Sequence, residues 1–530
     1  MKGHYSDVWQ AVAAALPDRL AIEDIDGRRW TYRRFAAEAG AVAAFFAAQG
    51  LRAGDRVAIL LYNRAEFLIT LFACLASGIT PVPMNYRYRP HEVAALLSDC
   101  DAAALVYPAS LAGVVTDAVG QAPRTPVLIA VDDGGGPAPG HRWEQVVARP
   151  AALPAAAPDG GELWVYTGGT TGMPKAAVWS GEELLDLQMY SIYAPTGIPV
   201  PGSLDEVVRV AQDATTPHVV TLPLAPLMHG TALFMSINTL VIGGSVLVTA
   251  RARYEPDQAV AFARRAGATR LVVAGDAVAA PLADAAERAG AEPLATVTTI
   301  ISSGMRFGAE TKRRLHRLGA VTIIDMLAAT EAGPFAFTTT RSEADLPGRL
   351  ELLPNAVILD ENHRPVAEPG ARGILALRGT LPKGYHGDPD RTRATFPLID
   401  GVRHVIPGDW VRVLSDGAVE LLGRGSAVIN TGGEKVYPAE VEEALMSHPA
   451  VADAVVVGVP DPRFGEIVAA AVVAEGIDAD ELIAYVGTRV AGYKKPRRIA
   501  FVADLDRTPH GKVDLARIRE LVAAESVTAE

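Results

Sequence analysis

Helix-like and strand-like hydrophobic patterns alternate through the first quarter of the chain. Apolar residues recur at helical spacing over residues 32–48, 65–76 and 90–97. Short apolar runs rich in β-forming residues cover 56–61, 81–84, 102–107 and 127–131. Such alternation is typical of βαβ units around a mostly parallel sheet. A segment rich in Gly, Pro and Ala at 134–158 then predicts a loop-dominated link to a second subdomain.

The second subdomain repeats this alternation, after which the pattern becomes strand-rich. Strand-like runs cover residues 245–248, 271–274, 297–302 and 321–325, after an irregular excursion at 197–217. Two further strands are expected beyond Gly348, at 356–359 and 373–378. We therefore expect an α/β fold whose large N-terminal part combines βαβ subdomains with a β-rich subdomain.

The end of the chain predicts a smaller α+β domain. Strand-like runs cover residues 451–459, 467–473 and 499–502, and we expect helices between them. A basic cluster at 492–498 reads Gly492-Tyr493-Lys494-Lys495-Pro496-Arg497-Arg498. Such a run is usually a solvated face.

Length and composition indicate a large globular protein with more than one domain. A chain of 530 residues exceeds the size at which a single core stops growing, roughly 250–300 residues. The apolar fraction of 49% is ample for burial, and the charged fraction of 21% is below that of disordered chains. The formal charge of −12 argues against non-specific binding to nucleic acid or to anionic membranes.

Three features bear on the cellular compartment. The first residues lack the basic segment and apolar core of a secretory signal. The most apolar stretch, 67–84, is interrupted by Ser77, Gly78 and two prolines, which predicts a helix and a short strand rather than a membrane span. Cys74 and Cys100 are expected to be buried free thiols in a reducing compartment. We therefore expect a cytoplasmic protein without integral membrane association.

A glycine- and threonine-rich loop follows an apolar run at 163–165. Its residues are Tyr166, Thr167, Gly168, Gly169, Thr170, Thr171, Gly172, Met173, Pro174 and Lys175. Glycines let backbone N–H groups approach phosphate oxygens, threonines add hydroxyl donors, and the lysine adds a positive charge. The loop is not a Walker A motif, because no Gly-Lys-Ser or Gly-Lys-Thr follows the glycines. A solvated turn is the structural alternative.

Further segments along the chain combine glycine turns with polar or charged residues. They are Pro226-Leu227-Met228-His229, Ser302-Ser303-Gly304-Met305-Arg306, Asp325-Met326-Leu327-Ala328-Ala329-Thr330-Glu331, Gly408-Asp409 with Gly423-Arg424, Thr431-Gly432-Gly433-Glu434-Lys435-Val436 and Pro509-His510-Gly511-Lys512. Taken alone, each has an ordinary structural reading, such as a core histidine, a strand-to-helix turn, a helix cap or a β-turn. Together they resemble the adenylate-forming superfamily of acyl-CoA synthetases, peptide-synthetase adenylation domains and luciferases. The resemblance covers nearly the whole chain.

The resemblance implies a site for ATP and Mg²⁺. It assigns the phosphates to residues 167–175, and Thr167 and Glu331 to the metal ion. It assigns the adenine pocket to Ser303, Gly304, Met305, Asp325, Met326 and Leu327, and the ribose to Asp409 and Arg424. It also implies that Thr330 contacts the α-phosphate, that His229 orients the substrate carboxylate and that Lys512 bridges this carboxylate and the α-phosphate. Leu327 stands where relatives carry an adenine-stacking ring, so apolar contact is expected instead of stacking.

The resemblance further implies two domains joined by a hinge at 423–430. The N-terminal adenylation domain covers 1–423 and a mobile C-terminal domain covers 424–530. Gly432, Gly433 and Lys435 would line a tunnel for the pantetheine arm of coenzyme A, where glycine permits close approach to the main chain. For the basic cluster at 492–498, a landing site for the CoA phosphates is the alternative to a solvated face.

The activity expected from the resemblance is that of an AMP-forming acid:CoA ligase. A carboxylic acid and MgATP give an acyl-adenylate, from which the CoA thiol displaces AMP. Small residues at Ala328 and Ala329 resemble members that act on bulky or long hydrophobic acids. Two alternatives stay open: an acyl-AMP ligase that loads a carrier-protein phosphopantetheine, and a non-catalytic nucleotide-binding protein. The oligomeric state is not readable, and a homodimer is one option.

Overall fold

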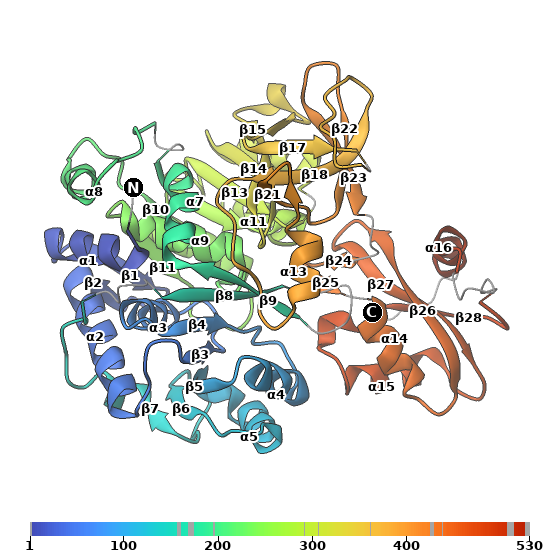
Figure 1. Cartoon of the computed structure of the whole chain (residues 1–530), viewed down its shortest axis with the longest axis horizontal. Coiled ribbons are helices and arrows are strands. Elements are labelled where there is room, and N and C mark those ends of the chain that lie inside the picture. The colour runs from blue at the N-terminus through green and yellow to red at the C-terminus, as the bar shows by residue number, and fades with distance from the viewer. Residues whose placement is uncertain are drawn as a thin grey trace.

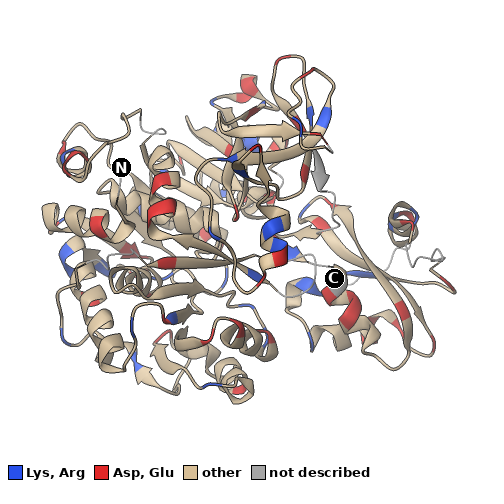
Figure 2. Cartoon of the chain, in the orientation of Figure 1, with Lys and Arg blue, Asp and Glu red and all other residues tan. Residues whose placement is uncertain are grey.

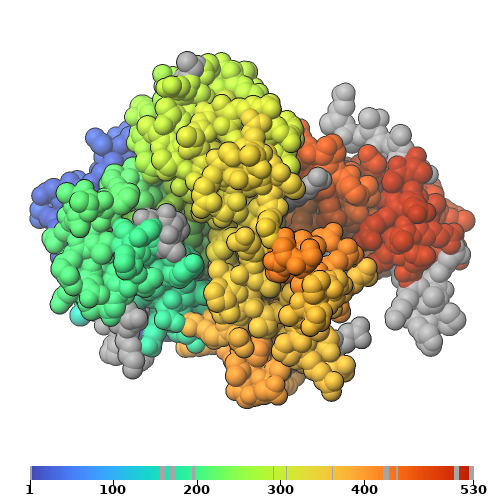
Figure 3. All heavy atoms as spheres, turned by 90° about the horizontal axis from the view of Figure 1, so that it is seen from above, coloured from blue at the N-terminus to red at the C-terminus, as the bar shows by residue number. Residues whose placement is uncertain are grey.

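The computed structural model describes residues 3–155, 161–167, 174–193, 197–290, 292–305, 307–360, 362–424, 429–436, 438–505 and 513–524. A large N-terminal domain is joined to a smaller C-terminal domain (Figure 1). The C-terminal domain forms one end of the molecule, where Figure 3 shows it in orange-red and red. The α/β fold class predicted from the hydrophobic pattern is confirmed.

The largest sheet carries the second predicted βα series. Its parallel part contains, in spatial order, β1 (Leu20–Asp24), β11 (Ser245–Val248), β10 (Val220–Pro223), β12 (Arg270–Val273), β13 (Thr299–Ser303) and β14 (Thr322–Ala329). The crossover helices are α9 (Gly230–Val241), α10 (Pro256–Ala266), α11 (Gly275–Ala289) and α12 (Ala309–Leu318). Because parallel strands need such crossovers, the carboxyl ends of these strands lie at one edge, where α/β proteins bind ligands.

A second parallel sheet is built from the first predicted series. Its spatial order is β4 (Thr80–Pro83), β3 (Arg56–Ile59), β5 (Ala102–Pro108), β6 (Val127–Val131) and β7 (His141–Arg142). The predicted helices are present as α2 (Tyr32–Ala48), α3 (Ala65–Ala76) and α4 (Pro90–Asp99). The segment 134–158 is mostly loop where described, but it also contains β7 and a short helix, α6 (Trp143–Val146).

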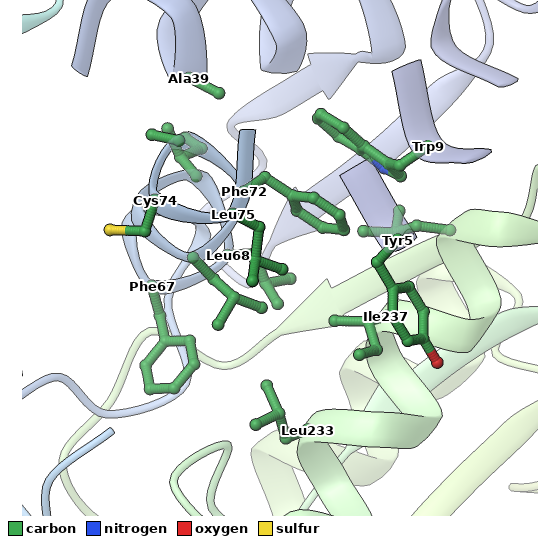
Figure 4. Packing of buried hydrophobic residues seen from close by; sticks show 14 of the residues in the cluster. Tyr5, Trp9, Ala39, Phe67, Leu68, Phe72, Cys74, Leu75, Leu233 and Ile237 are labelled. Carbon is green, nitrogen blue, oxygen red and sulfur yellow. The ribbon is translucent and has the colours of Figure 1, made fainter. Parts of the chain in front are cut away.

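The apolar helix α3 lies in the core of the large domain. Every residue of this helix is buried. Phe72 stacks on Trp9 with ring centroids 3.9 Å apart, and Leu233 and Ile237 of α9 belong to the same cluster (Figure 4). Burial of large apolar side chains is the main favourable term in folding, so the predicted core role of this stretch is confirmed. None of the helices in the described ranges is long and apolar enough to cross a membrane.

The β-rich subdomain continues the largest sheet in antiparallel fashion. β14 extends four residues past its predicted end because it pairs with β15 (Gly333–Thr340). The strands that follow include β16 (Leu350–Leu352), β23 (Val419–Arg424), β22 (Asp409–Val413), β18 (Arg372–Arg378) and β17 (Ala356–Leu359). A small separate sheet, β19 (Gly384–Tyr385), β9 (Lys175–Ser180) and β8 (Glu162–Thr167), carries the phosphate-loop segment.

Two predictions about local structure are wrong. The supposedly irregular excursion at 197–217 contains α8 (Leu204–Gln212), which Ser203 caps through the backbone N–H of Glu206 and which buries Val207 and Ala211. In the C-terminal domain, β26 (Val451–Asp461) and β27 (Gly465–Ala474) form a direct antiparallel hairpin with no helix between them.

Helices flank this hairpin in the C-terminal domain. α14 (Pro438–Met446) precedes it, α15 (Ala479–Gly487) leads to β28 (Arg498–Phe501), and α16 (Leu515–Ala524) follows. β27 and β28 pair in parallel, so the chain between them must cross over the sheet, and α15 lies in this crossover. Acidic and basic residues are interspersed over both domains (Figure 2), in keeping with an ordinary solvated surface.

Candidate active site

A large cavity lies at the carboxyl ends of the parallel strands and reaches the C-terminal domain. It contains about 1550 Å³ of empty space, its open mouth included. The predicted site residues that line it are Thr167, His229, Ser303, Gly304, Met326, Thr330, Gly433 and Lys435. These residues come from widely separated parts of the chain, so the fold brings together much of the set that the sequence motifs singled out.

Thr167, which lines this cavity, contacts Glu331, which lies behind the lining residues. The Thr167 hydroxyl donates a hydrogen bond of 3.0 Å to Glu331 Oε1, and both residues are buried. The Tyr385 hydroxyl donates to the same oxygen at 2.8 Å. Burial and the neighbouring Glu331 carboxylate raise the pKa of Tyr385, which keeps this phenol a proton donor. A carboxylate held by two donors is fixed in direction, as a ligand to a cation must be.

The ends of the phosphate-loop segment are placed by a β-ladder. Thr167 at the end of β8 pairs with Lys175 at the start of β9. The residues between them that the sequence assigns to phosphate binding, Gly168, Gly169, Thr170, Thr171 and Gly172, lie outside the described residues. Pro174 lines the cavity next to Lys175. The loop therefore begins and ends at this site.

Thr330 lies in the turn that joins β14 to β15. Its backbone carbonyl accepts a hydrogen bond of 3.0 Å from the Trp179 indole N–H. Because residues 330–332 connect two antiparallel strands, the alternative reading of Thr330 and Glu331 as a helix cap is wrong. The β14 register shifts between Leu327 and Ala328, directly before this turn.

The residues assigned to the adenine separate into two groups. Ser303, Gly304 and Met326 line the cavity, whereas Leu327 packs against the core of the β-rich subdomain. Asp325 instead pairs with Lys312 at 2.8 Å. Burial raises the pKa of Asp325 despite the opposing effect of Lys312.

Asp409 and Arg424, the two residues assigned to the ribose, face each other across the sheet. They are Cα partners in the antiparallel pair β22–β23, and Asp409 is buried. Asp409 is not among the residues that line the large cavity, and the side chain of Arg424 lies outside the described residues. The structure thus pairs the backbones of the two residues on neighbouring strands, and their role at the ribose stays a prediction.

His229 contacts a residue of the C-terminal domain. It occupies the N-cap position of α9 without a capping hydrogen bond from its side chain, and its Nε2 lies 3.5 Å from Oε1 of Glu434. Glu434 is buried and also accepts hydrogen bonds from Arg87 Nη1 at 2.5 Å and from Asn85 Nδ2 at 3.3 Å. Burial favours the neutral acid, but His229 and Arg87 together hold the pKa of Glu434 below its ordinary value.

The Gly432-Gly433 turn joins β24 (Ile429–Thr431) to β25 (Glu434–Val436). Both glycines have positive φ angles, +58° and +87°, which residues with a Cβ rarely adopt. A Cβ on Gly433 would lie 3.3 Å from the Met305 sulfur. The turn therefore presents bare backbone to the cavity, close to His229.

Lys494 is not part of a solvated basic face. It is buried, and its ammonium donates hydrogen bonds of 2.6 Å to Glu92 and 2.6 Å to Glu440. Arg89 donates to the backbone carbonyls of Gly487 and Val490. For Lys494 the reading as a solvated face is wrong, because the side chain is buried and paired, whereas the CoA-phosphate contact stays a prediction.

Several residues at this site had no assigned role in the sequence. The partners of Tyr385, Arg87 and Glu92 lie far away in the chain, so local spacing does not reveal these contacts. Glu434 directly follows the Gly-Gly turn, and that adjacency was the one usable signal. Lys512, the expected bridging lysine, lies outside the described residues.

Comparisons with known proteins agree over almost the full length. Residues 9–386 match the AMP-binding enzyme family, and residues 440–512 match the AMP-binding enzyme C-terminal domain. The medium-chain acyl-CoA ligase Mig of Mycobacterium avium is 36% identical, with 97% of this chain and 97% of that protein covered. The 3-oxocholest-4-en-26-oate–CoA ligase of Rhodococcus rhodochrous is 33% identical, with 96% of this chain and 94% of that protein covered.

A solved structure shares the two-domain fold. The amide bond synthetase McbA from Marinactinospora thermotolerans superposes with a TM-score of 0.79 at 25% identity, covering 98% of this chain and 99% of that one. The two family matches fall on the large domain and on the C-terminal domain in the expected order. The chain therefore belongs to the AMP-binding enzyme family.

Proposed function

We propose that this protein is an ATP-dependent carboxylic acid:CoA ligase, an AMP-forming acid–thiol ligase. The observation that carries the proposal is the hydrogen bond between Thr167 and Glu331, since Thr167 lines a cavity that the Gly433 turn also lines. Relatives named as acyl-CoA ligases, at 33–36% identity over nearly the full length, support it. We further propose that the domains divide at residues 423 and 424.

In the first half-reaction, a carboxylate oxygen of the acid attacks the α-phosphorus of ATP and pyrophosphate leaves. Thr330, at the cavity wall, would donate to the α-phosphate, and Lys512 would neutralise the charge that develops there. His229 would orient the attacking carboxylate. Asp409 and Arg424 would hold the ribose, and Ser303, Gly304 and Met326 the adenine.

A magnesium ion fits the oxygen donors of Thr167 and Glu331. Mg²⁺ prefers oxygen ligands and is usually bound by one or two carboxylates together with substrate phosphates. The Glu331 carboxylate and the Thr167 hydroxyl are such donors, and they already lie in contact. When bound, the ion would offset the negative charge of the phosphates.

In the second half-reaction, the CoA thiolate attacks the acyl carbon and AMP leaves. The pantetheine arm would run past the Gly432-Gly433 turn, because the bare backbone of this turn borders the cavity. The Arg87–Glu434 pair would hold this turn in place, since Glu434 directly follows Gly433.

We propose a medium- to long-chain or polycyclic hydrophobic acid as the substrate. Apolar side chains of α9, including Phe234 and Met235, line the cavity together with the small residues Ala328 and Ala329. Apolar lining favours apolar substrates in proportion to the area removed from water. The names of the relatives, which include fatty-acid and 3-oxocholest-4-en-26-oate ligases, also favour a hydrophobic acid as the substrate.

One experiment tests this proposal. The purified chain is incubated with MgATP and a panel of acids from acetate to steroid side-chain acids, with and without CoA, and AMP and acyl-CoA are measured. We expect AMP and acyl-CoA with the hydrophobic acids and little of either with acetate. Transfer only to a carrier-protein phosphopantetheine would overturn the CoA assignment. If no acid gave AMP, both enzyme functions would be excluded, and a non-catalytic nucleotide-binding protein would be the remaining alternative.

A further inference from the structure

Three buried polar side chains form a hydrogen-bonded relay that ends at the large cavity. Tyr5 of α1 (Tyr5–Ala15) lies beside α9 (Figure 4), and its hydroxyl donates a hydrogen bond of 2.6 Å to Asn238 Oδ1. Asn238 Nδ2 in turn donates to Gln188 Oε1 at 2.8 Å. Gln188 belongs to α7 (Gly181–Tyr193) and lines the cavity. All three residues are buried, with Gln188 only 2% exposed.

Tyr5 sets the direction of the hydrogen bonds in this relay. Burial raises the pKa of Tyr5 well above its ordinary value, so its hydroxyl keeps the single proton that it can donate. Among the described residues, Asn238 Oδ1 is the acceptor of that proton. The oxygen of the Asn238 amide therefore faces Tyr5, and its nitrogen faces Gln188. Gln188 must meet this nitrogen with its own amide oxygen.

The amide nitrogen of Gln188 is left as a hydrogen-bond donor at the cavity. Its Oε1 is occupied by Asn238, and its Nε2 makes no hydrogen bond to another described residue. The α9 residues Phe234 and Met235, which line the same cavity, are apolar and offer no strong acceptor. Buried polar groups are nearly always hydrogen-bonded, so this donor calls for an acceptor on the molecule that the cavity binds.

The relay lies far along α9 from the expected place of reaction. Asn238 is about 14 Å from His229 along the helix axis, at a rise of about 1.5 Å per residue. On the proposed function, the substrate carboxylate reacts near His229. A substrate group that reaches Gln188 is therefore separated from the reacting carboxylate by several carbon atoms of the acyl part.

We propose that Gln188 Nε2 donates a hydrogen bond to a ketone oxygen in the acyl part of the substrate, remote from the carboxylate that reacts. Gln188 is then a specificity-determining residue, and Tyr5 and Asn238 are positioning residues that hold its amide. A ketone suits this donor better than a hydroxyl, whose proton would need an acceptor as well. The inference rests on the proposed function and narrows its hydrophobic acids to those that carry an oxo group.

A competing donor, Arg270, lies near the same end of α9. It is buried, its Nε has no hydrogen-bond partner among the described residues, and burial lowers its pKa to about 10. Its Cα partner on β10 is Thr221, whose hydroxyl is hydrogen-bonded to that of Thr239, the residue after Asn238. Arg270 does not line the large cavity, which favours Gln188 as the donor that meets the substrate.

The test compares Gln188→Met with the wild type on matched acids. These are a saturated fatty acid and its oxo derivatives of the same length, with the ketone at successive carbon atoms, and a steroid side-chain acid with and without a ring ketone. Methionine keeps the length of the side chain and removes the amide. Pyrophosphate exchange gives kcat/KM for adenylate formation. We expect Gln188→Met to lower kcat/KM for the preferred oxo acid by about 10-fold, the worth of one hydrogen bond, and to raise it for the unsubstituted acid, which leaves the wild-type donor without a partner.

Tyr5→Phe tests the positioning role of the relay. Without the hydroxyl proton the Asn238 amide is free to turn, so we expect the preference for the oxo acid to fall, by a smaller factor than in Gln188→Met. Tyr190→Phe is the matched control, because Tyr190 lies on the same helix as Gln188 and is 56% exposed, and it should keep the wild-type preference.

The preference is a ratio of two kcat/KM values measured on one variant, so a general loss of activity cancels. An unchanged preference in Gln188→Met overturns the proposal, as does a wild type that prefers no oxo acid of the series, or a loss of preference confined to Arg270→Met. If the wild-type chain forms no adenylate with any acid, the proposed function fails instead. Calorimetric binding of the same acids to the wild type and to Gln188→Met then decides whether Gln188 recognises the ketone.

Discussion

Lys494 of the C-terminal domain donates a hydrogen bond of 2.6 Å to Glu92 of the large domain, although the two residues lie 402 positions apart. The same ammonium donates to Glu440 at 2.6 Å. Buried charges are tolerated when they are paired, and breaking such a pair leaves an uncompensated charge. This triad therefore favours the domain orientation in which the Gly433 turn lines the cavity.

Lys494→Met tests the role of this triad. The change leaves Glu92 and Glu440 without their cation, a loss that costs about 3–5 kcal/mol for a buried pair. We expect thioester formation from preformed acyl-adenylate to slow by at least about 10-fold, while adenylate formation keeps its rate. Single-turnover assays of each half-reaction measure both. Lys495→Met is the control, since Lys495 has no ion pair in the described structure, and equal slowing of both half-reactions would contradict the assignment.

The Glu440 carboxyl predicts a dependence of stability on pH. Burial raises the pKa of Glu440 to about 7, against the opposing effect of Lys494. A raised folded-state pKa contributes stability that is fully present below the unfolded pKa, near 4.5, and is lost as the pH rises through about 7. As the pH rises from about 4.5 to above about 7, we expect the melting temperature to fall more in the wild type than in Glu440→Gln.

A matched change on the same helix controls for other titrating groups. Glu443 is exposed on α14, so Glu443→Gln should keep the wild-type dependence of melting temperature on pH. A Glu440→Gln profile identical to the wild-type profile would show that Glu440 does not titrate in this range.

We expect changes at Glu331 and Tyr385 to alter the Mg²⁺ dependence of the first half-reaction. Glu331→Gln keeps the side-chain volume but removes the charge, and we expect adenylate formation to drop by about 100-fold or more. Tyr385→Phe removes one donor to the carboxylate and should cost about 10-fold or less, with a higher Mg²⁺ concentration needed for half-maximal rate. Pyrophosphate exchange across a Mg²⁺ titration measures both effects. Tyr190→Phe, at an exposed tyrosine, should behave as wild type. An unchanged Mg²⁺ requirement in Glu331→Gln would remove this residue from the metal site.

Lys512→Ala should slow the first half-reaction and spare the second, whereas Lys494→Met should do the reverse. We expect adenylate formation to fall by about 100-fold, because an ammonium that offsets charge at the α-phosphorus is lost. Thioester formation from preformed adenylate should change little. Rapid-quench measurements of both steps decide the matter, and similar losses in both would argue against the bridging role.

Local sequence patterns were sufficient for much of the secondary structure. The helices α2 and α3 and the strands β6 and β11 begin and end at the predicted residues, because each buries an apolar face whose period is set within the element itself. Helix α8 was missed because a short helix buries only Val207 and Ala211, among glycines and prolines that indicate a loop. The β26–β27 hairpin was missed because strand partners are chosen across the chain.

The sequence by itself determined the fold class and eight of the residues that line the large cavity, since several of their motifs lie at strand ends that a parallel sheet collects at one edge. Only the tertiary structure decided which charged residues form ion pairs. Asp325 pairs with Lys312, Glu434 pairs with Arg87, and Lys494 pairs with its two glutamates. Burial makes such pairing obligatory, but the partner is set by how elements pack within and between the two domains, and no local pattern of residues encodes that.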